Sequence, residues 1–242
     1  MITLIYPYYD SPEMFKIHQK NWLSYSEEFR NKLRIIVVDD CSQRLPAKDA
    51  VILKGEIPFS LYRIKVDVAW NWRSARNIGA YEAEKDSWLF MTDMDLLIPE
   101  HTISGLFKRL DSGWLSKNNF YTFDRVIAPD MRQYKNHPNT YFFHQDLYRK
   151  IGGYDECVSG IYGLDGVFRR RLERGCMGAV HLKGLKIVFY QRDYVFDASV
   201  STLPRKENRD TEEVQKARQI LKSRFQKGIM PDVCTFPYER II

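Results

Sequence analysis

The stretch Ser87–Asp95, SWLFMTDMD, decides the fold. After Ser87, the four residues Trp88–Met91 form a short, uninterrupted apolar run, which is typical of a strand buried on both faces of a parallel sheet. Thr92 ends the run, and Asp93 and Asp95 follow with one residue between them. A buried strand that ends abruptly in two carboxylates predicts a sheet whose edge carries acidic chemistry.

The same design occurs earlier in the chain, where the apolar run Leu33–Val38 stops at Asp39 and Asp40. Further elements alternate around these two strands: strands at 2–6 and 61–66, a helix starting at Ser11-Pro12, and a helix from 72 to about 85. Alternation of strands and helices predicts an α/β fold of the doubly wound type. Ligands of such folds bind at the carboxyl ends of the strands, where both acidic pairs fall.

The second half of the chain is less regular. We expect strands at 120–127, 141–143 and 186–191, a polar loop at 131–140, a helix at 164–174 and a charged helix at about 211–227. The whole chain is expected to form a single domain. Within it, about 1–99 is expected to bind a nucleotide-bearing donor, about 100–200 is expected to bind the acceptor, and about 205–242 is expected to be a C-terminal helical extension.

Composition narrows the class of protein. With 44% hydrophobic residues among 242, a substantial core is available, which excludes wholesale disorder. The net charge of +6 suits partners that carry phosphate, including nucleotide sugars, nucleic acids and anionic membranes. No nucleic-acid-binding motif accompanies this charge. The four cysteines are widely spaced and indicate neither a zinc site nor a disulfide framework.

The amino terminus has no basic leader, and no apolar run is long enough to cross a bilayer. We therefore expect a soluble, cytoplasmic protein. The basic amphipathic face of the last predicted helix is compatible with peripheral membrane contact.

Asp93 and Asp95 can point to one place if Met94 turns away from it. Such oxygen ligands suit Mg²⁺ or Mn²⁺, which can bridge to a diphosphate and offset charge on a leaving group. The alternative is an ordinary solvated loop. For Asp39, the alternatives are a turn or cap and a carboxylate that accepts a hydrogen bond from the imide N–H of uracil.

Arg73, Arg76 and Asn77 share one face of the helix that starts near Trp72, because residues three and four apart are neighbours. Guanidinium groups near the acidic strand ends could bind the diphosphate of a donor. The alternative is a solvated face with ordinary ion pairs. Asp165, at the start of another helix, is by itself an acid favoured by the helix dipole.

Four motifs occur in the order seen in family 2 glycosyltransferases: IIVVDDCS (35–42), WNWRSARNIGAYEAEKDSWLFMTDMDLLIP (70–99), FHQDLYRKIGGYDE (143–156) and YGLDGVFRRRL (162–172). The chain resembles this family over roughly residues 2–192, and its segment Trp70–Pro99 also resembles animal beta-1,4-galactosyltransferases. The resemblance implies the GT-A fold, a Rossmann-like mixed sheet flanked by helices. It also implies a nucleotide-sugar donor, a glycan or other hydroxyl acceptor, and a divalent metal, Mn²⁺ or Mg²⁺.

The resemblance assigns roles to individual residues. In the donor site, Pro7 and Tyr9 contact the nucleoside after the first strand, Asp39 binds uracil, and Arg76 lies near the phosphates. Asp93 and Asp95 correspond to the metal-binding DxD pair, with Asp95 the direct ligand. On the acceptor side, Asp165 corresponds to the catalytic base of inverting members, and Tyr162 packs against the acceptor sugar.

The chain departs from the family pattern at two places. Leu164 replaces the acid that usually precedes the catalytic base. The strand after this helix lacks the metal-binding histidine of many relatives, so the third ligand is Gln191, Asp193, His181 or no protein residue.

We therefore predict an inverting, metal-dependent transfer of a sugar, with UDP as the expected nucleotide. The alternatives are a sugar nucleotidyltransferase, which would release pyrophosphate, a nucleic-acid-binding module, and a catalytically inactive sugar-binding relative. The sequence contains no Gly-rich, Lys-containing phosphate loop of the kind a nucleotidyltransferase uses.

Overall fold

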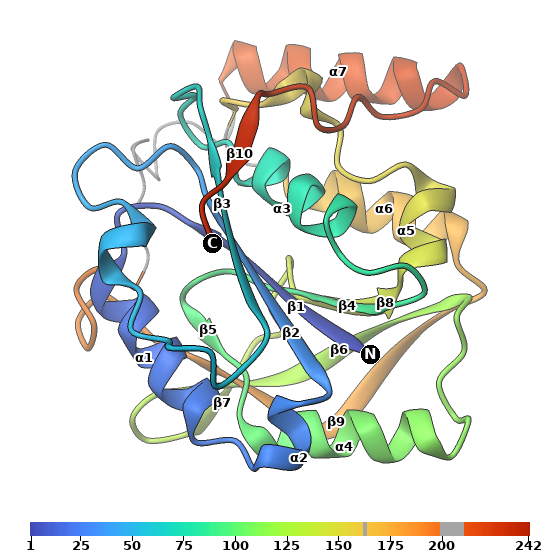
Figure 1. The fold of residues 1–242 in the computed structure, drawn as a ribbon. Helices are drawn as coiled ribbons and strands as arrows, with labels where there is room; N and C mark the ends of the chain where they lie inside the picture. Colours follow the sequence, from blue (N-terminus) through green and yellow to red (C-terminus); the bar gives the residue numbers. More distant parts are fainter. Residues whose placement is uncertain (162–163, 199–210) are drawn as a thin grey trace.

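The computed structural model describes residues 1–161, 164–198 and 211–242. Within these ranges, ten strands form one mixed sheet flanked by helices (Figure 1). The strands are β1 (Ile2–Tyr8), β2 (Leu33–Asp39), β3 (Phe59–Ile64), β4 (Trp88–Met91), β5 (Leu96–Leu97), β6 (Asn119–Ile127), β7 (Arg132–Tyr134), β8 (Tyr141–His144), β9 (Gly178–Phe189) and β10 (Tyr238–Arg240). The helices are α1 (Pro12–Leu23), α2 (Glu27–Arg30), α3 (Trp72–Tyr81), α4 (Glu100–Asp111), α5 (Gln145–Ile151), α6 (Gly166–Gly175) and α7 (Glu212–Gln226).

The strand order β10-β3-β2-β1-β4-β8-β6-β9-β5 places β1 between β2 and β4, and all three run parallel. The chain therefore builds outward from β1 through β2 to β3, then returns and adds β4 on the other side. After β1 the chain continues toward β2, whereas after β4 it continues into the other half of the sheet. A switch of this kind opens a crevice at the carboxyl ends of the strands. Both acidic pairs lie there.

Strand β8 is antiparallel to its neighbour β4, and Met91 pairs with Tyr141. The residues that leave β4 consequently lie beside the residues that enter β8, although Met91 and Tyr141 are about 50 positions apart in the chain. This pairing brings the loop before β8 into the crevice, next to Asp93 and Asp95.

The two faces of the sheet are covered by different helices (Figure 1). Along β1, Leu4 and Tyr6 join a core with α1 and α4, whereas Ile5 joins a second core with α3, α5 and α6. Helix α3 lies so close to β1 that a Cβ on Gly79 would stand 2.4 Å from a methyl carbon of Ile5. Glycine at this position permits the close approach of helix α3 to β1.

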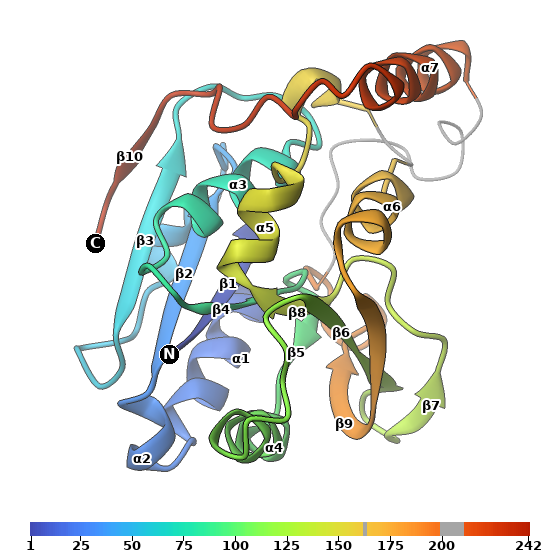
Figure 2. The same ribbon diagram turned by 90° about the vertical axis from the view of Figure 1, so that its right-hand side faces the viewer.

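The C-terminal part of the chain continues beyond the sheet and returns to it (Figure 2). Val214, Ala217 and Leu221 of α7 form one apolar stripe that packs against Leu164 and Val158. The chain then passes Glu156, whose carboxylate accepts bonds from the N–H groups of 234 and 235, and ends in β10 on the β3 edge. The predicted helix 211–227 is therefore confirmed, and it packs on the α6 end of the molecule.

Several boundaries differ from those predicted. Strand β1 was expected to end at Tyr6, but pairing with β2 carries it through Pro7 to Tyr8, so Pro7 is a buried strand residue rather than part of a following loop. The last large strand begins at Gly178 rather than 186, because it pairs with nearly all of β6. Helices α2, α4 and α5 and strands β5 and β10 had no prediction. Strand β7 lies within the segment 131–140 that was predicted as a polar loop, because residues 132–134 pair with β6. All four cysteines are free, and no described helix is long and apolar enough to span a membrane.

Candidate functional site

The loop after β4 is held by its backbone and by its middle side chain. Met94 is buried in the core beneath the sheet, so Asp93 and Asp95 turn to the opposite side, as the spacing predicted. His18 lies with Nε2 2.7 Å from the carbonyl oxygen of Met94, and the N–H of Tyr190 donates to the carbonyl of Asp95. These contacts fix the loop without using the Asp93 or Asp95 carboxylate.

His137, from the loop before β8, completes the acidic pair. One ligand atom each from Asp93, Asp95 and His137 lie within 4.8 Å of one another, and His137 Nε2 is 3.4 Å from Asp93 Oδ2. The other ring nitrogen, Nδ1, is 2.9 Å from Thr140 Oγ1, which in turn lies 2.9 Å from Thr92 Oγ1. This chain of contacts fixes the ring and aims Nε2 at the carboxylates.

The protonation state of His137 suits metal binding. Burial, together with the nearby Arg125 and Arg76 guanidinium groups, holds the pKa of His137 well below its usual value. The imidazole is therefore neutral at pH 7, which is the form that binds a metal ion. Two carboxylates and a neutral imidazole fit Mn²⁺ or Mg²⁺, with open positions left for oxygen atoms of a ligand.

Arg76 is fully buried and organises the site from below. It donates to the carbonyl of Asn139, to the hydroxyl of Tyr154 and to Asp93 Oδ1. Because Arg76 binds one oxygen of Asp93, the second oxygen faces His137. The sequence predicted a donor-site arginine; in this structure its charge serves to position Asp93.

Asp39 is committed to its own loop. Its side chain is only 2% exposed, Oδ1 accepts from the Ser42 N–H, and Oδ2 accepts from the Ala47 N–H and from Arg63. These bonds close the turn after β2, which is the alternative reading of this acid from the sequence.

Asp40, the next residue, is also buried, but its carboxylate accepts fewer hydrogen bonds than that of Asp39. Its Oδ1 has no hydrogen-bond partner within the described chain, while the backbone N–H of Asn71 donates to its carboxylate. Burial, with the nearby Asp39 and Asp67, raises the pKa of Asp40 well above its usual value. Burial and the charges of Asp67, Asp10 and Asp40 likewise raise the pKa of Tyr9. Asp40 and Tyr9 are thus neighbours at the end of β1 and β2.

Asp165 lies at the N-terminus of α6, half-exposed, and its side chain makes no capping hydrogen bond. Burial lowers the pKa of Arg73 to about 10, and the nearby Asp165 carboxylate acts in the opposite direction by favouring the charged guanidinium. Arg73 also donates to the carbonyl of Ile161. Asp93 and Asp165 both contribute to raising the pKa of Tyr154, after the larger effect of burial. The Tyr154 hydroxyl therefore lies within the electrostatic reach of both acids.

Other predicted site residues lie elsewhere. Tyr162 falls outside the described residues. His181 binds Asp124 and Thr122 between β9 and β6, and it does not belong to the acidic cluster. Among the described residues, only His137 meets Asp93 and Asp95 as a third histidine, cysteine or acidic ligand. The sequence predicted a loop at 131–140, which contains His137. It did not predict that the next strand, β8, runs antiparallel to β4, and this pairing brings His137 to Asp93 and Asp95.

The model of the glycosyl transferase family 2 matches residues 5–172 of the chain, from β1 through most of α6. The chain belongs to glycosyl transferase family 2. The match ends within α6, so α7 and the C-terminal segment lie outside the part that defines this family. No curated protein sequence matches this family 2 chain significantly.

Solved structures share its fold. S. aureus TarS 1-349 in complex with UDP-GlcNAc superposes with a TM-score of 0.70 at 12% identity, over 92% of this chain and 65% of TarS 1-349. A mannosyltransferase from Pyrobaculum calidifontis, in complex with GDP-Man and Mn²⁺, gives a TM-score of 0.58 at 16% identity, over 94% of this chain and 64% of that one. The family 2 chain thus has the predicted GT-A fold and spans about two thirds of these two neighbours.

Proposed function

We propose that this family 2 chain transfers a sugar from a UDP-sugar to an acceptor hydroxyl, with inversion and with Mn²⁺ or Mg²⁺ bound. The observation that carries the proposal is the cluster of Asp93, Asp95 and His137 beside Arg76, at the carboxyl ends of the parallel strands. Two structures of the same fold, one bound to UDP-GlcNAc and one to GDP-Man with Mn²⁺, support a nucleotide sugar and a metal as ligands.

In this proposal Asp95, His137 and one oxygen of Asp93 hold the metal ion. When bound, the ion offsets the negative charge that develops on the departing diphosphate. Arg76 keeps Asp93 in place, and Arg73, which remains charged at pH 7, contributes positive potential between the donor and Asp165. The chain thereby supplies a preorganised electrostatic site for the leaving group.

For the nucleoside we propose Asp40, beside Tyr9, in place of the predicted Asp39. A carboxylate that already accepts two bonds from its own loop and one from Arg63 of β3 has little capacity left for a ligand. Asp40 has an oxygen without a partner and can accept the imide N–H of uracil. Pro7, buried in β1, would then shape the floor of the nucleoside site rather than contact it from a loop.

Asp165 is the proposed catalytic base. It takes the proton of the acceptor hydroxyl while the acceptor oxygen forms a bond to the anomeric carbon and the bond to the diphosphate oxygen breaks. UDP leaves from the opposite side, which inverts the anomeric configuration. The carboxylate suits this role because it is half-exposed and α6 does not use it as a cap.

The direct test is thermal stabilisation by UDP with Mn²⁺. A ligand that binds only the folded protein stabilises it by about 2.7 kcal/mol at a hundredfold excess over its dissociation constant. Asp95→Ala should remove the Mn²⁺-dependent part. If UDP and the other nucleoside diphosphates leave the melting temperature unchanged with Mn²⁺ present, the proposed donor site is wrong.

A further inference from the structure

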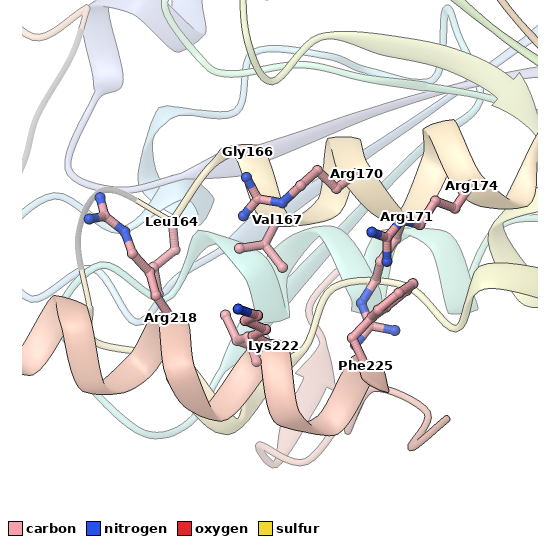
Figure 3. Close-up of a pocket in the computed structure, with 10 residues that line it drawn as sticks. Leu164, Gly166, Val167, Arg170, Arg171, Arg174, Arg218, Lys222 and Phe225 are labelled. Carbon is pink, nitrogen blue, oxygen red and sulfur yellow. The ribbon is translucent and has the colours of Figure 1, made fainter. Parts of the chain in front are cut away.

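A groove of about 600 Å³ lies between α6 and α7, outside the donor site (Figure 3). Its floor is apolar, and its walls carry arginines of α6 on one side and basic residues of α7 on the other. The lining residues are Leu164, Gly166, Val167, Arg170, Arg171, Arg174, Arg218, Leu221, Lys222 and Phe225. Five of these are cations and none carries a carboxylate, so the groove has a strongly positive potential.

Three of these five cations have no acidic partner within the part of the chain that the structure describes. Among the described residues, no ion pair involves Arg170, Arg174 or Lys222. Arg174 instead stacks on the Phe225 ring, 4.2 Å from its centroid. Arg171 is nearly buried, has an Nε without a hydrogen-bond partner, and lies 3.5 Å from an Asp155 oxygen that Arg224 also binds. Concentrating unpaired cations in a recess costs stability through repulsion, and a bound anion would remove that cost.

The groove begins beside the proposed catalytic base. Leu164 and Gly166, which line one end of it, flank Asp165 in the chain. The Arg170 guanidinium reaches back along α6, so that a Cβ on Gly166 would stand 3.7 Å from Nη1 (Figure 3). A molecule lying along the groove can therefore present one end to Asp165. The second wall, α7, lies beyond the residues that match the family, so this groove is a feature of the chain's own C-terminal part.

We propose that the groove binds phosphate groups of the acceptor, a molecule that carries phosphate next to the hydroxyl that receives the sugar. This inference rests on the proposed function, because it takes Asp165 as the base. Guanidinium groups bind phosphate in bidentate fashion, and the apolar floor would take the carbon skeleton between phosphates. A neutral glycan would gain nothing from five cations.

A membrane surface fits the same charges less well. The cations line a recess between two helices, whereas a plane of lipid headgroups would meet an outward face. Glu212 and Glu213 are exposed at the start of α7, and they would repel an anionic bilayer that approached this helix. We therefore assign the phosphate groups to the acceptor itself.

Binding of inorganic tripolyphosphate, measured by calorimetry in EDTA at low salt, tests the groove without a metal-bound donor site. The triple variant Arg170→Gln/Arg174→Gln/Lys222→Gln should bind tripolyphosphate on the order of 10- to 100-fold more weakly, because charge-assisted bonds are lost. The matched control is Arg169→Gln/Lys216→Gln, on the same two helices. Both control residues are exposed, pair with Glu173 and Glu212, and do not line the groove. The control should bind within about twofold of wild type.

Three outcomes would overturn the inference: no tripolyphosphate binding by wild type, an equal loss in the control, or groove-dependent binding to phosphatidylglycerol vesicles without binding of tripolyphosphate. With an acceptor in hand, the triple variant should raise KM for its phosphorylated form and leave KM for the same acceptor after phosphatase treatment unchanged. Stabilisation by UDP and Mn²⁺ should be the same in all variants. Its absence in wild type would refute the donor site, while tripolyphosphate binding would still report on the groove.

Discussion

Two strand ends in this chain have the same sequence design and different structures. After β2, the carboxylate of Asp39 closes the loop by accepting two backbone N–H groups and Arg63. After β4, His18 and the N–H of Tyr190 hold the loop through its carbonyl groups. The loop after β2 is closed by the side chain of an aspartate, whereas the loop after β4 is held by bonds to its backbone carbonyl groups.

The difference shows how a functional carboxylate can be separated from a structural one. Buried polar groups are almost always hydrogen-bonded, so an acid whose oxygens are accepted into the local backbone has its role explained. An acid whose loop is held by other groups is left with capacity to bind. By this criterion Asp39 has a structural role, because its carboxylate accepts two backbone N–H groups and Arg63. The proposed metal site uses Asp95 and one oxygen of Asp93, and the proposed nucleoside site uses Asp40.

Asp165 lies at the start of helix α6, and its carboxylate, unlike that of Asp39, does not close the local backbone. Its substitution has the largest expected effect. Because the Asp165 side chain makes no capping bond, Asp165→Asn should leave the free energy of unfolding nearly unchanged. The affinity for UDP should stay within a few-fold of wild type, because Asp165 is proposed to face the acceptor. The amide cannot accept the proton of the acceptor, and positioned general bases contribute about 10² to 10⁴-fold. Transfer should fall by that factor, measured as initial rate at saturating donor. Undiminished turnover would leave Asp165 as a helix-start acid.

His18 supports the loop after β4 and should make it sensitive to acid. Burial lowers the pKa of His18 to about 4 from the ordinary 6.5. Between these values the unfolded chain binds a proton that the folded protein does not, so stability falls as pH falls from about 6.5 toward 4. At pH 4.5 this group alone should cost about 2.5 kcal/mol relative to pH 7.

His18→Gln keeps an N–H for Met94 and does not titrate, so this part of the acid sensitivity should disappear from urea denaturation at pH 7 and 4.5. Tyr6 and Trp22 pack on the ring, so the variant is expected to be less stable at pH 7 for reasons of packing alone. The change with pH is therefore the quantity to compare. An unchanged pH dependence would mean that other groups carry the acid sensitivity.

His137 and His181 provide a matched pair for the third metal ligand. Losing an outer-shell partner of a metal site typically costs 10- to 100-fold in affinity, and losing a ligand should cost at least that much. His137→Ala should weaken Mn²⁺ binding in the presence of UDP accordingly, as measured by calorimetry. His181→Ala should not, because that ring binds Asp124 and Thr122 away from the cluster. The reverse result would restore the ligand suggested by the sequence.

Much of the fold was predictable because it depends on local pattern. Continuous apolar runs identified β2 and β4, and the amphipathic pattern of the charged segment at about 211–227 identified α7. The turning of Met94 into the core followed from its spacing between two aspartates. These features need only the period of the side chains and the position of polar breaks.

The arrangement of the site depended on long-range pairing that no local pattern contains. His137 reaches Asp93 because β8 runs antiparallel to β4, and no local pattern predicts that these two strands are neighbours. Arg76 was predicted to lie near the phosphates of the donor, and its burial and three bonds within the chain, one of them to Asp93, were not predictable from its helical spacing. The groove between α6 and α7 likewise depends on where the last helix docks.

The smallest expected effects come from the two adjacent acids after β2, and they should be opposite in kind. Asp39→Asn places an amide where two backbone N–H groups and Arg63 now donate, and unsatisfied buried donors typically cost about 1–3 kcal/mol. Denaturant unfolding should show this loss, with UDP affinity preserved in the folded fraction. The raised pKa of Asp40 means that its ionised form is unfavourable in the folded protein. Asp40→Asn replaces this carboxyl by a neutral amide, so the free energy of unfolding at pH 7 should be unchanged or slightly higher. Its affinity for UDP should fall by roughly tenfold, about 1.4 kcal/mol, while Mn²⁺-dependent binding of pyrophosphate stays the same. If Asp39→Asn instead loses UDP and Asp40→Asn instead loses stability, the two acids have been assigned in the wrong order.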